Sequence, residues 1–452
     1  MPLKLKSSKG RINTGLLVPI VLVLSLLLIL FLIFNCIHVF SGNRAEAIEM
    51  LGIIAQGSAA LTAIVFAFLT YISQTIIGKY VSGTIKYLYK HRNFVILIVF
   101  YSSATITNAV IMWIFPKLQL NLLVDVSSSL LLLEIIMLPL LFFVQSKLLN
   151  PETIIDTLLG KPDLKNTQTI ENTMENVKVV FDMVYKLAEN KEYDGATHGL
   201  KKISEIITSR NEVNPIGMYQ WGIPNYERIG VECFIYDPNI SAFVMSQFNE
   251  MIDHLTDKTP HDLFVASSMI ATACFKIAKA VAEKSYCEDT LMRSYFLLQK
   301  IYVAQSLVDY DAFATDELDK IVQIVKMAIK ANVQPVLMIS AIEESCMRLV
   351  GKKNRMMQLL FAFTLEVFPK DDRTLQDFVV IIFCVVPTIE KESADYLIEM
   401  IKMKFGHLEI EFSKTDQPSR TEIGVRNGVV TVKSGNKEIA EKVKWFKEKM
   451  VH

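Results

Sequence analysis

The chain has 452 residues, of which 51% are hydrophobic, and its 47 basic side chains balance 47 acidic ones; this length is enough for two or three domains. Residues 1–146 hold ten of the basic and four of the acidic side chains, so a basic, apolar N-terminal third precedes a mildly acidic remainder. An acidic soluble part without basic runs excludes nucleic acid as an expected partner.

Four apolar segments in the N-terminal third predict membrane-spanning helices. A helix needs about 20 apolar residues to cross the hydrocarbon core, and each charge at mid-membrane costs about 2.5–3.5 kcal/mol on insertion scales. Three of the segments carry no formal charge, and the fourth carries only Glu134. We therefore expect a basic N-terminus over residues 1–15 and a four-helix transmembrane domain over residues 16–148. The expected spans are residues 16–40, 50–77, 94–115 and 126–146.

Basic residues indicate which way the spans point. The segment before the first span holds four Lys or Arg residues, as does the loop between the second and third spans, whereas the other two loops hold one each. Because Lys and Arg accumulate in cytoplasmic loops, we expect a multi-pass protein of the cell membrane with both termini in the cytoplasm. The alternative for the first segment is a cleaved signal peptide, but the apolar core of such a peptide is only about 7–15 residues long.

The basic loop between the second and third spans allows two interpretations. Lys79, Lys86 and Lys90 fall on one face of a helix drawn through the loop, and Arg92 follows them. In the first interpretation the loop is an interfacial amphipathic helix whose four basic side chains contact anionic lipid headgroups. In the second it is an ordinary positive-inside loop.

Polar residues form a layer at one depth inside the predicted spans. Glu134 lies eight residues from the outer end of the fourth span, which is about 12 Å along a helix. No span contains Lys or Arg, so we expect Glu134 either to be protonated and hydrogen-bonded or to face water or an ion. The alternative is a neutral side chain that only joins helices. The layer also contains Gln56, Ser58 and Thr62 in the second span and Thr107 and Asn108 in the third, with Tyr101 and Thr105 deeper.

Residues 149–405 predict an all-α cytoplasmic domain. Apolar residues recur every three or four positions from Ile170 to Leu187, which is the period of an amphipathic helix. Short turns between the predicted helices favour a bundle or an α-solenoid, and we place the bundle first because the chain shows no clean repeat period. Further helices are predicted over residues 196–209, 260–283, 289–307, 315–331, 335–350, 353–367, 373–385 and 389–404.

The segment Asn211–Asn239 is rich in Pro, Gly and aromatic residues and interrupts the helical pattern. A loop of this length is often a lid or a contact surface. We favour the alternative, in which the segment packs on the helices and its aromatic side chains complete their core.

The last part of the chain changes its period and predicts a small α+β appendage over residues 406–452. Leu408, Ile410 and Phe412 alternate with acidic residues, as on a half-buried strand, and Asn427–Gly428 is a strong hairpin signal. A helix over residues 437–450 follows. Because three short strands need packing partners, we expect the appendage to dock on the helical domain or on a neighbouring subunit.

No pattern that carries chemistry is present. The phosphate-binding, His-Glu-x-x-His and Gly-x-Ser-x-Gly motifs are missing, and the acidic run from Asp309 to Asp319 lacks the glycine of a calcium loop. The His/Asp cluster over residues 253–262 is explained in part by helix capping. The six cysteines form no Cys-x-x-Cys pair and are typical of buried thiols in a reducing compartment. We therefore expect no catalytic residues, no metal, no cofactor and no enzymatic activity.

Part of the membrane region resembles a known family. The segments Ile54–Gly57 and Ala63–Phe66, Gln74 and the basic loop before the next span resemble a prokaryotic family of uncharacterised four-span predicted membrane proteins with a C-terminal soluble domain. The resemblance covers residues 50–115 and contains no catalytic motif. It implies a four-span topology and a prokaryotic source, and it implies no activity.

Two classes of function fit these features. The first is an oligomeric, channel-like or transport-related membrane protein with Glu134 in its polar layer and regulation by the helical domain, which would bind a cytoplasmic protein or a small molecule. The second is a non-conducting membrane scaffold or sensor whose soluble domain docks a protein partner. In both, the lipid bilayer is a partner and the chain forms a homo-oligomer.

Overall fold

The computed structural model describes the chain as two compact units, Met1–Gly160 and Lys161–His452. The first predicted span, residues 16–40, lies outside the described residues, as do Lys86 and Lys90 of the basic loop. The described residues are 43–80, 84, 92–118, 122–160, 167–209, 215–255, 258–284, 287–308, 311–331, 333, 335–385, 391–406, 408–415 and 421–451.

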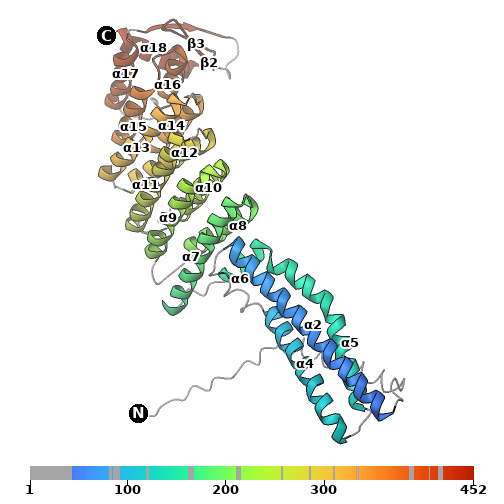
Figure 1. Cartoon of the computed structure of the whole chain (residues 1–452). Helices are drawn as coiled ribbons and strands as arrows, with labels where there is room; N and C mark the ends of the chain where they lie inside the picture. The colour runs from blue at the N-terminus through green and yellow to red at the C-terminus, as the bar shows by residue number, and fades with distance from the viewer. Residues whose placement is uncertain are drawn as a thin grey trace, which may run out of the picture. The chain divides into compact units, whose positions relative to one another are not determined.

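Three long helices of the first unit pack against one another in every pairwise combination (Figure 1). The first begins with a capping box, in which the Asn43 side chain accepts hydrogen bonds from two backbone amides and Glu46 accepts one from the Asn43 backbone. Each helix contains one of the predicted spans. The helices of this unit are α2 (Arg44–Lys79), α4 (Arg92–Leu118), α5 (Leu122–Leu148) and the short α6 (Pro151–Leu159).

The outer surface of these three helices is mostly apolar. Ile53, Ile106 and Trp113 are 63%, 64% and 68% exposed, whereas the inward faces include the polar residues Ser58 and Glu134, which are fully buried. A water-soluble bundle shows the opposite distribution. The surface of the unit is therefore one that hydrocarbon solvates better than water.

Four described helices are long and apolar enough to cross a membrane: α2, α4, α5 and α11 (Pro260–Lys284). The apolar stretch of α11 is 50% buried, against 22% for α2, 28% for α4 and 39% for α5. Helix α11 lies inside the second unit, where α9, α10, α12 and α13 contact it. The apolar residues of α11 therefore belong to the core of the second unit.

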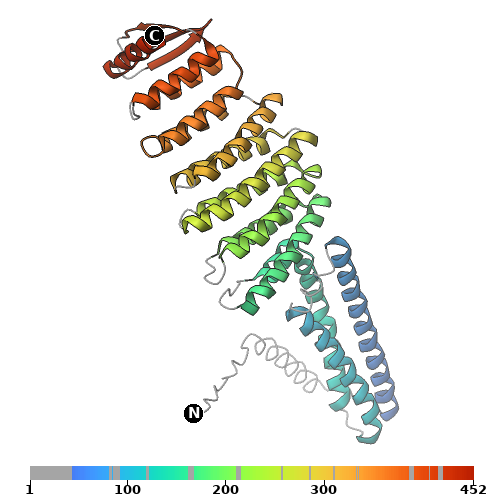
Figure 2. The same cartoon turned by 90° about the vertical axis from the view of Figure 1, so that its left-hand side faces the viewer.

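The second unit is a stack of helices in two layers, as Figures 1 and 2 show. One layer consists of α8, α10, α12, α14 and α16, each in contact with the next, and the other consists of α7, α9, α11, α13, α15 and α17. This arrangement is an α-solenoid, not the single bundle that we placed first. The helices not yet given are α7 (Thr167–Glu189), α8 (Tyr193–Thr208), α9 (Pro215–Glu232), α10 (Pro238–Leu255), α12 (Glu288–Leu307), α13 (Asp311–Lys330), α14 (Pro335–Leu349), α15 (Asn354–Val367), α16 (Asp372–Val385) and α17 (Lys391–Phe405).

The segment expected to be a long loop is mostly helical, so that expectation was wrong. Helix α9 covers Pro215–Glu232, a short 3-10 helix η2 (Cys233–Ile235) follows, and α10 begins at Pro238. The glycines that suggested turns allow close helix contacts instead. A Cβ at Gly222 would lie 2.3 Å from Ile207 Cδ1 on α8, and one at Gly230 would lie 2.5 Å from Ile277 Cδ1 on α11.

Aromatic residues from this segment are part of the solenoid core. Tyr226 is fully buried, its ring stands edge-on to Phe181 of α7 at 5.3 Å between centroids, and its hydroxyl donates to the carbonyl of Leu200 on α8. The Ser241 hydroxyl on α10 donates to the Gly230 carbonyl at 2.7 Å. The aromatic side chains therefore join three helices, as the packing interpretation predicted.

The C-terminal appendage covers the end of the stack. Its hairpin turns at Asn427 and Gly428, whose φ angles of 54° and 79° fit a type I′ turn, and both backbone amides donate to the Asp372 carboxylate of α16. Helix α18 packs on α17, where Lys449 pairs with Asp395 at 2.9 Å. The elements are β1 (Glu409–Ser413), β2 (Thr421–Arg426), β3 (Val429–Ser434) and α18 (Lys437–Val451), with sheet order β1-β3-β2 and β1 parallel to β3.

Candidate functional site

A buried polar cluster joins the three long helices of the first unit. The Ser58 hydroxyl of α2 donates to Glu134 Oε1 of α5 at 2.6 Å and lies 3.3 Å from Thr105 Oγ1 of α4. Thr62, one turn further along α2, has its hydroxyl 2.5 Å from that of Thr105. In this cluster, α4 runs antiparallel to α2, and α5 runs parallel to α2.

Backbone carbonyls complete the hydrogen bonds of this cluster. The Tyr101 hydroxyl of α4 donates to the Glu134 carbonyl at 2.8 Å, and the Thr62 hydroxyl lies 3.2 Å from the Tyr101 carbonyl. A carbonyl inside a helix can accept a second hydrogen bond because it has two lone pairs. The tyrosine is therefore held as a donor, and it fixes α4 against α5.

The structure brings together part of the predicted polar layer. Ser58, Thr62 and Glu134 lie in the cluster, and Asn108 is buried on the inner face of α4. Gln56 and Thr107 lie on exposed, outward faces of α2 and α4. Depth along a span could be counted from the sequence, but the rotation of each helix, which decides what faces inward, depends on its neighbours.

Two members of the inner set keep polar atoms without hydrogen-bond partners. Glu134 is fully buried and its Oε2 has no partner in the described part of the chain, and Asn108 is 1% exposed with neither Nδ2 nor Oδ1 paired. The described residues of α2, α4 and α5 include no Lys or Arg except near the helix ends. A buried carboxyl group and a buried amide without hydrogen-bond partners are unusual inside a helix bundle.

The predicted headgroup contacts are described only in part. Lys79 is the last residue of α2, with Nζ 5.5 Å from the centre of the Tyr80 ring, and Arg92 is the first residue of α4. Both lie at helix ends that flank the basic loop. Since Lys86 and Lys90 lie outside the described residues, the interfacial helix stays a prediction.

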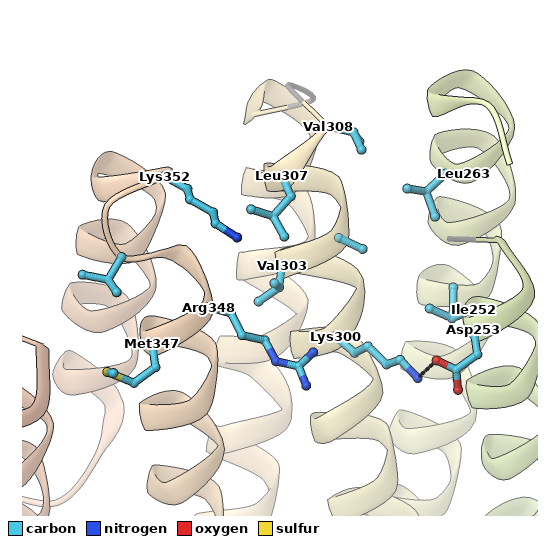
Figure 3. Close-up of a pocket in the computed structure, with 12 residues that line it drawn as sticks. Ile252, Asp253, Leu263, Lys300, Val303, Leu307, Val308, Met347, Arg348 and Lys352 are labelled. Carbon is cyan, nitrogen blue, oxygen red and sulfur yellow. Dashed lines mark ion pairs between the residues drawn. The ribbon is translucent and has the colours of Figure 1, made fainter. Parts of the chain in front are cut away.

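A groove of 460 Å³ crosses α10, α12 and α14 of the solenoid (Figure 3). Its apolar lining includes Ile252, Leu263, Val303, Leu307 and Met347. A second hollow, formed by the same three helices, shares Lys300, Val303 and Arg348 with the first. The two hollows therefore adjoin along α12 and α14 and together make up the groove, and Leu263 of α11 borders the first of them.

Charged side chains cross the groove. Lys300 Nζ pairs with Asp253 at 2.5 Å and donates to Asn249 at 2.8 Å. Arg348 pairs with Glu344 on its own helix at 2.7 Å, with 56% of its side chain exposed. Lys352 extends into the groove beside Leu307 (Figure 3). The first hollow is thus lined by three cations and one acid, Asp253, and the second hollow adds the acid Glu344.

A buried hydrogen-bond chain beside the groove links α12 to α14. Tyr295 of α12 donates to the Met338 carbonyl of α14 at 2.8 Å, and Gln299 Nε2 donates to the Tyr295 hydroxyl at 2.6 Å. Ser345 of α14 donates to Gln299 Oε1 at 3.1 Å. Burial raises the pKa of Tyr295 well above its ordinary value, so its hydroxyl stays a donor and the two helices stay clamped.

The described residues include inert buried thiols and no grouped metal ligands. Burial raises the pKa of Cys233 and of Cys346 to about 12, so neither thiol is a reactive thiolate. No group of three or more His, Cys, Asp or Glu side chains in the described ranges is placed to hold a metal. In the His/Asp cluster, Asp253 pairs with Lys300, and the Thr259 hydroxyl caps α11 through the Asp262 amide.

Comparison with known proteins adds no assignment: no family model, no curated protein and no solved structure matches this chain.

Proposed function

We propose that the chain is a membrane-anchored scaffold whose α-solenoid binds an acidic, amphipathic segment of a protein partner. The groove across α10, α12 and α14 carries this proposal, because it combines an apolar floor with basic side chains. Solenoids present extended surfaces of stacked helices, and such surfaces commonly bind peptides and proteins. An amphipathic helix with an apolar face and flanking carboxylates complements this lining.

The anchor in this proposal is the first unit. Its apolar outer surface and the length of α2, α4 and α5 support insertion in the cell membrane. The lysine-rich loop after α2 supports a cytoplasmic position for both termini and for the solenoid. Lys79, Lys86, Lys90 and Arg92 would then contact lipid headgroups, and the solenoid would meet its partner near the membrane surface.

Peptide binding to the full-length protein in detergent tests the groove. The probe is a labelled helical peptide with Leu on one face and Glu beside it. The control peptide has the same sequence with Lys in place of Glu. We expect the acidic peptide to bind and the basic one to fail. The double variant Arg348→Glu, Lys352→Glu should lower affinity by about tenfold or more, because it replaces attraction by repulsion at the groove.

A matched control variant makes the same change in charge on α18, away from the groove. Lys444 and Lys447 are exposed on α18, and their replacement by Glu should leave peptide affinity unchanged. Equal loss in both double variants would mean that only net charge matters, which contradicts the groove. Loss confined to a Lys326→Glu, Lys330→Glu variant would place the peptide in the hollow between α11 and α13 instead.

A second candidate function, an oligomeric conduit or transport-related protein, is favoured by a single observation. Glu134 is a fully buried acid with no cation beside it in the described helices. Acids at such positions serve in proton and ion pathways of membrane proteins. Flux measured in vesicles that contain the purified protein, with Glu134→Gln as control, separates this function from a non-conducting scaffold.

A further inference from the structure

Among the described residues of the first unit, buried polar atoms without hydrogen-bond partners occur at successive levels along the helices. They are Glu134 Oε2, both side-chain amide atoms of Asn108, and the Ser127 hydroxyl. Ser127 and Asn108 are each 1% exposed and Glu134 is fully buried. Polar groups buried at these positions normally have partners, and unpaired ones indicate sites where water or an ion is accommodated.

The order of these groups along the bundle follows from the contacts around them. Val124 of α5 packs with Ile111 of α4 and with Ala47 and Leu51 of α2 at one end. Asn108 lies one turn inward from Ile111, and Ser127 lies one turn inward from Val124. The Ser58–Glu134 hydrogen bond lies further in, since Glu134 is ten residues beyond Val124, about 15 Å along the helix. The unpaired atoms thus run from the end of the bundle towards Glu134.

Few charged or titratable groups of the described helices lie near Glu134. Helix α2 has no charged residue between Glu49 and Lys79, and α4 has none between Arg92 and Lys117. The phenol of Tyr101 faces the site from α4, where it donates to the Glu134 carbonyl. On α5 itself the nearest other acid is Asp125, which is 8% exposed near the bundle end.

We propose that Glu134 binds an exchangeable monovalent cation, either a proton or Na⁺, and that Asn108 and Ser127 form the path by which the cation reaches it. An ionised carboxylate enclosed in an apolar bundle without a neighbouring cation is strongly disfavoured. The carboxyl therefore carries a proton or holds an alkali ion. This inference is independent of the solenoid groove and of the partner proposed for it.

The unpaired atoms distinguish this site from a purely structural glutamic acid. A structural Glu has its acid proton and both oxygens satisfied by neighbouring helices. Here the Ser58 hydroxyl donates to one oxygen, while the other oxygen and the Asn108 amide have no partner among the described residues. Oxygen atoms of carboxyl, amide and hydroxyl groups are also the ligands that hard cations such as Na⁺ prefer.

Labelling with a hydrophobic carbodiimide, which reacts with protonated carboxyl groups, tests the site on the full-length protein in vesicles. Glu134 modification is read by peptide mass from pH 5 to pH 9 in choline chloride and in sodium chloride of equal concentration. We expect labelling that falls about tenfold for each pH unit above its midpoint, and none at this position in Glu134→Gln. Protection by Na⁺ at fixed pH assigns the alkali ion, and labelling that ignores Na⁺ assigns the proton.

The path is tested by a jump from pH 9 to pH 6 with labelling after increasing delays. Asn108→Leu should slow the recovery of labelling without abolishing it, and the outward-facing Thr107→Val should recover like the parent. Thermal melting shows that each variant is folded. A Glu134 that stays unlabelled at every pH in the folded protein, or that labels equally at pH 5 and pH 9, is a fixed structural contact and overturns the proposal.

Discussion

Replacement of Gly230 by Ala tests whether close helix contact explains the glycines of α9. The added Cβ would lie 2.5, 2.9 and 3.3 Å from Cδ1, Cγ1 and Cγ2 of Ile277, which is fully buried on α11. Overpacking of this kind costs about 1–3 kcal/mol. Alanine recovers about 1 kcal/mol of helix propensity over glycine. The net expectation is a destabilisation of up to about 2 kcal/mol.

A double-mutant cycle with Ile277→Ala identifies the cause. Ile277→Ala removes all three atoms that the new Cβ meets, so Gly230→Ala should be neutral or stabilising in that background. The assay is thermal and denaturant unfolding of the full-length protein, followed by near-ultraviolet circular dichroism. A net change of about 1 kcal/mol shifts the melting temperature by about 2–4 °C in a unit of this size.

The outcome that contradicts this reasoning is a Gly230→Ala variant at least as stable as the parent in both backgrounds. Glycine at this position would then only weaken the helix, and the contact between α9 and α11 would be looser than the structure shows. Equal destabilisation in the two backgrounds would also contradict it, because the clash with Ile277 would not be the cause.

Three further results are expected. Burial raises the pKa of Glu317, on α13, above its ordinary value of 4.5. The folded state therefore binds this proton more tightly than the unfolded state, and the free energy of unfolding falls as the pH rises above about 4.5. Glu317→Gln should therefore gain stability relative to the parent as the pH rises from 4 to 7. A difference in melting temperature between variant and parent that is the same at every pH would refute this. Lys404 of α17 donates to the carbonyls of Leu365, Glu366 and Phe368 at the end of α15; Lys404→Met should cost about 1–3 kcal/mol, and a variant with unchanged denaturant midpoint would show that water replaces the amine. Deletion of residues 407–452 exposes the α16–α17 end of the stack, so the shortened protein should melt earlier; unchanged melting and oligomer size would show that the appendage does not stabilise the solenoid.

Local patterns in the sequence determined most of the secondary structure. The apolar period of 3.6 residues placed the helices of the solenoid except α9 and α10, and the second, third and fourth predicted spans lie within α2, α4 and α5. Asn427–Gly428 placed the hairpin, because a type I′ turn needs two positive φ angles that this pair tolerates. These features depend on neighbouring residues alone, which is why they could be derived before any contact was known.

Only the tertiary structure decided what these elements build. The helices of the solenoid repeat in their contacts and not in their residues, so the sequence shows no repeat period that would indicate a solenoid. Gly222 and Gly230 suggested turns, although they serve close packing of α9 against its neighbours. In the polar layer, depth was countable but rotation was not, so Gln56 and Thr107 face outward while Thr105 joins Ser58. The groove that carries the proposed function combines α10, α12 and α14, and long-range packing alone brings those helices together.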